Sequence, residues 1–129
     1  MNINEKIKSL IPEMKNWRHH IHENPEIAYE EKNTSKFIVK KLNEFGIETH
    51  KDLGGTGIVG IIHGKDNGSS NKSIGIRADM DALPMTEKTN LPYSSKNPGR
   101  MHACGHDGHT TMLMGAAKYL AETKNFSGT

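Results

Sequence analysis

Apolar residues near the start of the chain recur at helical spacing. Six of them follow one another at three- or four-residue intervals: Ile3, Ile7, Leu10, Met14, Trp17 and Ile21. This spacing places them on one face of a helix and predicts an amphipathic helix over residues 3–22. Pro12 lies inside the pattern and predicts either a kink or the start of a second helix. Asn24-Pro25 predicts the end, because a residue before proline avoids helical backbone.

Two further segments have the same period. Residues 30–45 place Phe37, Ile38, Lys41, Leu42 and Phe45 on one side, and Gly46 provides a stop signal. From Gly108 to about Thr123 a third helix is predicted. Its buried face would hold Met112, Leu113, Ala116, Ala117 and Leu120.

Between these helices the period changes to that of strands. Residues 47–51, 57–63 and 73–79 each predict a short strand, and a Gly54-Gly55 turn separates the first two. Residues 65–72 are polar and predict a hairpin tip, whereas residues 85–100 predict irregular structure. Helices, a hairpin and a strand–loop–helix in this order favour a layered α/β domain, and 129 residues suffice for one.

Candidate chemistry is concentrated in the segment His102-Ala-Cys104-Gly-His106-Asp107-Gly-His109. A thiol, three imidazoles and a carboxylate this close together are typical of a divalent-metal site. Cys104 and His106 would point to the same side of extended backbone. His106 and His109, three residues apart, would share one helix face. The N-terminus of that helix would favour the thiolate form of Cys104. The alternative is a buried cysteine among hydrogen-bonded histidines.

Two carboxylates follow the third predicted strand. Asp79 and Asp81 stand two residues apart, and Pro84 blocks a helix just afterwards. Such side chains at a strand end either bind metal or hold a ligand histidine through its second ring nitrogen. The alternative is a turn with solvated aspartates. His19, His20 and His22 form a second histidine group, for which we expect surface positions or ordinary hydrogen bonds rather than metal binding.

Composition narrows the class of protein. The net charge is +2, with both signs interspersed, and no basic run alternates with aromatic residues, so we expect no nucleic-acid partner. The apolar runs are too short to cross a bilayer, and the first residues lack a signal-peptide pattern. The single cysteine excludes a disulfide framework within the chain. These features predict a cytoplasmic protein without a membrane partner.

Three motifs together resemble one family: Arg18-His-His-Ile-His22-Glu-Asn-Pro-Glu26, Arg77-Ala-Asp79-Met-Asp81-Ala-Leu-Pro84 and Met101-His-Ala-Cys104-Gly-His106-Asp-Gly-His109-Thr. They are similar to the N-terminal part of dinuclear metal-dependent amidohydrolases and metallopeptidases of the carboxypeptidase G-like type. The most similar branch includes hippurate hydrolases, N-acyl-amino-acid amidohydrolases, N-acetyldiaminopimelate deacetylases and auxin-conjugate hydrolases. The resemblance implies an α/β/α catalytic domain with a mixed sheet, of which residues 1–129 would be the N-terminal portion.

The resemblance also implies residue roles. Cys104 and His106 correspond to two metal ligands, and Asp81 corresponds to the catalytic aspartate that orients the metal centre. Asp79 stands where other branches carry a ligand histidine. His102, Asp107 and His109 would be supporting or substrate-side groups. The implied cofactor is a pair of divalent ions, either zinc, manganese or cobalt.

The implied reaction is hydrolysis of the amide bond of small N-acyl amino acids or related conjugates. In such enzymes the glutamate base, the remaining ligands and a lid domain that can form a homodimer come later in the chain. We therefore expect residues 1–129 to be incomplete, to bind metal weakly and to turn over negligibly. Two alternatives remain: a non-catalytic metal-binding or regulatory module, and a thiol redox protein, for which a resolving cysteine is missing.

Overall fold

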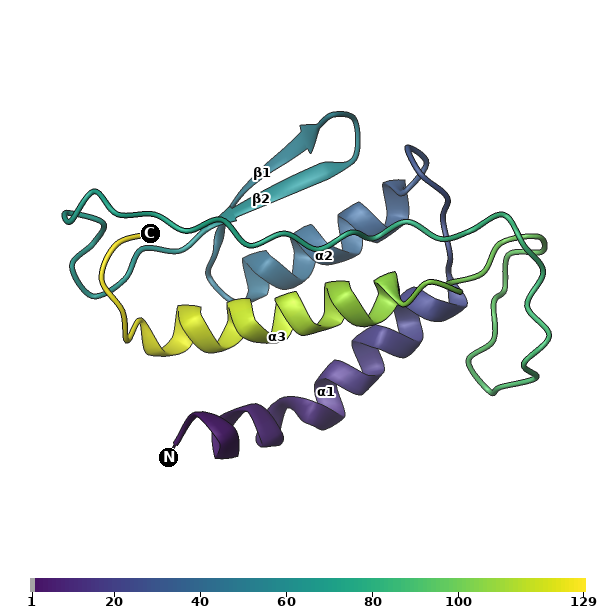
Figure 1. Ribbon diagram of the computed structural model, residues 1–129, viewed down its shortest axis with the longest axis horizontal. Coiled ribbons are helices and arrows are strands. Elements are labelled where there is room, and N and C mark those ends of the chain that lie inside the picture. The colour runs from purple at the N-terminus through teal and green to yellow at the C-terminus, as the bar shows by residue number, and fades with distance from the viewer. Residues whose placement is uncertain (1) are drawn as a thin grey trace.

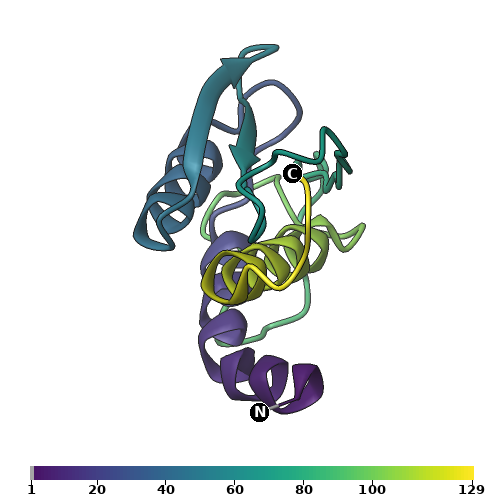
Figure 2. The same cartoon turned by 90° about the vertical axis from the view of Figure 1, so that its left-hand side faces the viewer.

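The computed structural model describes residues 2–129 and has a mixed α/β fold, as predicted. Its elements in chain order are α1 (Ile3–Glu23), α2 (Lys32–Glu44), β1 (Glu48–Leu53), β2 (Gly57–Ile61) and α3 (His106–Thr123). The helix α3 packs against both α1 and α2, and the β1–β2 hairpin covers α2 (Figure 1). The perpendicular view shows α3 between α1 at one end and the hairpin at the other (Figure 2).

The first helix confirms the prediction from apolar spacing. It runs without interruption through Pro12, so the proline starts no second helix. At its N-terminus the Asn2 side chain accepts from the Glu5 amide at 2.9 Å, and the Glu5 carboxylate accepts from the Asn2 amide at 3.2 Å. This reciprocal pair satisfies two backbone donors that a helix start leaves without partners.

The predicted hairpin is also confirmed. Strands β1 and β2 pair antiparallel, with Glu48 opposite Ile61 and Thr49 opposite Gly60. Gly54 and Gly55 between the strands have φ angles of +61° and +101°, a conformation that glycine adopts without a steric penalty.

A small apolar core joins the three helices to the hairpin. Its buried members are Trp17, Ile38, Leu42, Ile47 and Met114. The helices α1 and α3 approach closely at Gly115, where an added Cβ atom would lie 2.7 Å from the Met14 side chain. The helices are thus held at the spacing that brings the first turn of α3 alongside the end of α1.

The predicted third strand is wrong. Residues 73–79 belong to no ladder in the described part of the chain, and the sheet consists of β1 and β2 alone. Ile74 and Ile76 are 82% and 64% exposed. Alternating apolar residues give strand propensity, but a strand also needs a partner for its backbone groups.

The polar segment 65–72 is therefore not a hairpin tip, since it does not join two paired strands. Backbone bonds from the last residues close it instead. The Gly64 amide donates to the Gly128 carbonyl at 2.9 Å, and the Thr129 amide donates to the Lys72 carbonyl at 2.9 Å. The predicted irregular segment 85–100 is confirmed.

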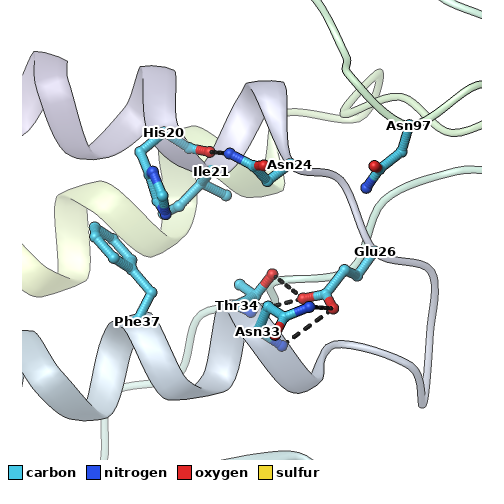
Figure 3. Close-up of a pocket in the computed structure, with 8 residues that line it drawn as sticks. All are labelled: His20, Ile21, Asn24, Glu26, Asn33, Thr34, Phe37 and Asn97. Atoms are coloured by element: carbon cyan, nitrogen blue, oxygen red, sulfur yellow. Dashed lines mark hydrogen bonds between the residues drawn. The ribbon is translucent and has the colours of Figure 1, made fainter.

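The start of α2 receives its cap from a distant side chain. Glu31, at the N-cap position, makes no side-chain capping bond. The buried Glu26 carboxylate instead accepts from the Thr34 amide at 2.6 Å and from the Asn33 amide at 3.1 Å, with two further bonds from the side chains of these residues (Figure 3). A carboxylate at this end also interacts favourably with the helix dipole.

Glu26→Ala should therefore lower the free energy of unfolding by about 2 kcal/mol, the upper range for a lost helix cap. Urea titration followed by circular dichroism measures it. Glu30→Ala is the matched control, because Glu30 is 53% exposed and pairs only with Arg100 in the described structure. Equal effects of the two substitutions would contradict the capping role.

Candidate metal centre

His106 and Asp81 form the best-defined contact of the predicted site. The first residue of α3 is His106, and its Nδ1 lies 2.9 Å from both the backbone oxygen and the Oδ1 atom of Asp81. Because both neighbours are acceptors, Nδ1 carries the proton and donates. In the neutral ring, the other nitrogen, Nε2, then has the lone pair that a metal-binding histidine needs.

Asp79 lies next to that free nitrogen. Its Oδ2 is 3.5 Å from His106 Nε2, and its Oδ1 accepts from His109 Nδ1 at 2.8 Å. The hydrogen bond from His109 is the largest influence on the pKa of Asp79 and holds it below the ordinary value, although partial burial acts in the opposite direction. Asp79 is therefore ionised at neutral pH and available as an oxygen ligand.

Ligand atoms of Asp79, His106 and His109 all lie within 4.8 Å of one another. Two imidazoles and a carboxylate are a donor set that suits zinc or manganese, so these residues fit a divalent ion. The sequence-based prediction named all three but gave Asp79 and His109 lesser roles. The signals for these two residues were the position of Asp79 at the end of the predicted third strand and the three-residue spacing of His106 and His109.

Local structure fixes this cluster. Gly105 precedes α3 with a φ angle of +91°, so the chain can turn sharply into the helix. His106 and His109 then lie one turn apart, with their ring centroids 5.4 Å from each other. The Thr110 hydroxyl donates to the Asp79 backbone oxygen at 2.9 Å and thereby joins the extended segment to α3.

Cys104 lies just before this turn as an exposed free thiol. Within residues 2–129 it does not belong to the group formed by Asp79, His106 and His109. Its assignment as a metal ligand, like the catalytic assignment of Asp81, stays a prediction.

The remaining two predicted site residues are buried. The Asp107 carboxylate contacts α1, where it accepts from His22 Nδ1 at 2.8 Å and from Arg18 Nε at 3.2 Å. His102 is 5% exposed, and neither of its ring nitrogens makes a hydrogen bond within residues 2–129. Burial without a partner lowers the pKa of His102 to about 4, so its ring is neutral near pH 7.

The second histidine group behaves as expected. His22 is buried between two carboxylates, His19 stacks on Tyr93 with ring centroids 3.6 Å apart, and His20 packs against Phe37. Sequence reasoning missed one member of this network, Glu87, which accepts from His22 Nε2 at 3.0 Å. A lone glutamate in a polar irregular segment carries no signal that could have identified it.

A pocket of about 220 Å³ lies where the end of α1 meets α2 (Figure 3). His20, Phe37 and Glu26 line it, but Asp79, His106 and His109 do not. The metal cluster is therefore separate from this pocket. None of the helices in residues 2–129 combines the length and apolar character that a bilayer crossing requires.

Fold and site together define a mixed α/β protein with a carboxylate–imidazole cluster suited to a divalent ion. Comparison with known proteins shows which family it is similar to. Residues 75–129 match the model of peptidase family M20/M25/M40. The chain is 54% identical to hippurate hydrolase of Campylobacter jejuni over 99% of its own length and 32% of that protein. It is 41% identical to N-acyl-L-amino acid amidohydrolase of Geobacillus stearothermophilus, over 94% of this chain and 33% of that one.

A solved structure agrees. The crystal structure of a Bacillus subtilis protein described as a dinuclear metal binding peptidase from the M20 family superposes with a TM-score of 0.82 at 42% identity, covering 89% of this chain and 32% of that one. The resemblance predicted from the three motifs is confirmed: the chain is similar to members of peptidase family M20/M25/M40 over nearly its whole length. It spans about a third of the length of the curated relatives that it matches.

Proposed function

We propose that this chain contributes part of the metal centre of an enzyme that hydrolyses the amide bond of N-acyl amino acids or related small conjugates. The observation that carries the proposal is the orientation of His106. Its Nδ1 is held by Asp81, so its Nε2 is left free beside the Asp79 carboxylate. The names of the relatives, hippurate hydrolase and N-acyl-L-amino acid amidohydrolase, support the substrate class.

Two ligand sets would hold a divalent ion, and both contain His106. The resemblance favours Cys104 with His106, whereas proximity favours Asp79, His106 and His109. When bound, a pair of divalent ions polarises the amide carbonyl and lowers the pKa of a water molecule. Zinc, manganese and cobalt are the candidates, and availability as well as ligand type decides between them.

The chain's own residues orient and charge this centre. Asp81 fixes the tautomer and ring direction of His106, and His109 holds Asp79 ionised. The described cluster offers three ligand atoms, which suit one ion better than two. We therefore propose that a second ion and a general base need groups other than residues 2–129. Residues 1–129 are then the N-terminal portion of a single catalytic domain, and we expect them to hydrolyse substrate at a negligible rate alone. A homodimer of the intact enzyme is part of the same proposal.

Metal content and hydrolysis, measured on the same samples, test this function. The protein is stripped with a chelator, reloaded with zinc, manganese or cobalt, and assayed on hippurate and N-acetyl amino acids. We expect residues 1–129 to retain an ion without turnover, and the polypeptide that the gene encodes to hydrolyse the amide only when metal is present.

Three other results would change the proposal. Failure of both samples to bind metal would overturn it. Metal binding without hydrolysis by the encoded polypeptide would replace the enzyme by a non-catalytic metal-binding module. Metal-dependent turnover by residues 1–129 alone would refute the incompleteness of their site.

A further inference from the structure

The motif of residues 18–26, at the end of α1, contacts three separate parts of the molecule. Arg18 reaches Asp107 at the start of α3, Glu23 pairs with Lys96 in the irregular segment, and Glu26 caps α2. The metal cluster contains no residue of this motif. Its residues thus connect elements that lie far apart in the sequence.

His22 is the central residue of these connections. Its Nδ1 lies 2.8 Å from Asp107 Oδ2, and its Nε2 lies 3.0 Å from Glu87 Oε1. The side chains of His22, Asp107 and Glu87 are 5%, 2% and 3% exposed. A buried imidazole between two carboxylates fixes the position of both, because each carboxylate would otherwise lose a charged or polar partner in a dry environment.

Through Asp107, the contacts of His22 extend to the first turn of α3, which carries His106 and His109 and is called the metal-binding turn below. Asp107 lies between His106 and His109 in sequence, within the first turn of α3. The backbone amides of Gly108 and His109 donate to the Gly105 carbonyl at 2.9 and 3.0 Å and close that turn. A carboxylate anchored to α1 therefore sets the rotation of the turn that carries both histidines.

On the other side the contact reaches the irregular segment 85–100. Glu87 accepts from His22, from the Ser95 amide at 2.6 Å and from the Thr89 hydroxyl. Tyr93 stacks on His19, one turn before His22 on α1. The irregular segment 85–100 is thus fixed to α1, the helix that also anchors the metal-binding turn.

We propose that His22 is a positioning residue that locks the metal-binding turn of α3 and the segment 85–100 in a fixed relation to α1. This role rests on the proposed function, because it matters only where the turn holds an ion. In this role His22 touches neither metal nor substrate. It acts through Asp107 on the metal-binding turn and through Glu87 on the segment 85–100.

Amide hydrogen exchange of the metal-free protein tests the positioning directly. In His22→Gln we expect the Ser95 and His109 amides to exchange at least tenfold faster. Amides in the middle of α2, such as that of Ile38, should stay within twofold of the wild type. His20→Gln is the matched control, since it is the same substitution on the same helix at an exposed position. Equal acceleration throughout the chain, α2 included, would mean a general structural role and would overturn the proposal.

Two further variants separate the two connections. Glu87→Gln should accelerate the Ser95 amide but leave the His109 amide within twofold of the wild type. Asp107→Asn should do the reverse. If both variants loosened both segments equally, the two sides would not be joined through His22 as proposed. Should His22→Gln fail to fold, these two variants still decide between the outcomes.

Metal affinity then tests the consequence of the positioning. Titration with cobalt should give affinity about tenfold lower in His22→Gln, the lower end for loss of a supporting residue around a metal site, and unchanged affinity in His20→Gln. Unchanged cobalt affinity in His22→Gln would overturn the role at the metal centre. A wild-type protein that bound no ion would refute the proposed function instead, while the exchange experiment would still decide whether His22 fixes the two segments.

Discussion

His106→Ala is expected to lower the affinity for divalent metal by at least about 100-fold, the upper range for supporting groups and a lower limit for a ligand. His106 belongs to both ligand sets, and its Nε2 is the nitrogen that the Asp81 contact leaves free. Competition between the protein and a chromophoric chelator for zinc measures the change. His106→Gln is an informative companion, because glutamine keeps a hydrogen-bonding group but not an imidazole lone pair.

Two single substitutions then distinguish the ligand sets. If the ion is bound by Asp79, His106 and His109, His109→Ala should weaken binding strongly and Cys104→Ala should change it little. If Cys104 is a ligand, Cys104→Ala should weaken binding strongly and His109→Ala should change it little. The cobalt-loaded protein should then also show a thiolate charge-transfer band that disappears in Cys104→Ala. An unchanged affinity in His106→Ala would contradict both sets and remove the centre as described.

The helices were predictable because their evidence is local. Ile3 to Ile21 repeat at helical spacing, and α1 follows that pattern to within a residue at its end. The hairpin was equally predictable from the Gly54-Gly55 turn between two short segments with the spacing of strands. Residues 73–79 have the same local pattern but form no strand here, since a ladder depends on a partner segment that spacing does not reveal.

The candidate site was only partly predictable. The i, i+3 spacing of His106 and His109 placed them on one helix face, and the position of Asp79 and Asp81 after an extended segment suggested a nearby contact. By contrast, Asp107 was predicted to be a supporting or substrate-side group, but spacing did not reveal that its carboxylate meets Arg18 and His22. These partners are more than 80 residues away in the sequence, and only the packing of α1 against α3 brings them together.

His102 should make the protein lose stability as the pH falls from about 6.5 to 4. Its folded-state pKa is about 4, against an ordinary value of 6.5, because burial disfavours the charged ring. Between these two pH values the unfolded chain binds a proton that the folded chain does not. Stability from this group is therefore complete above pH 6.5 and decreases toward pH 4, by on the order of 3 kcal/mol at most.

Urea unfolding at several pH values, with a chelator present, measures this loss. His102→Leu should reduce the slope between pH 6.5 and 4, because it removes the ring that takes up a proton only in the unfolded chain. It should also cost little near pH 7, because a buried ring with neither nitrogen hydrogen-bonded gives up no bond when an apolar side chain replaces it. An identical slope in wild type and variant would mean that His102 takes up its proton in the folded state, and would imply a polar partner for its ring that residues 2–129 do not supply.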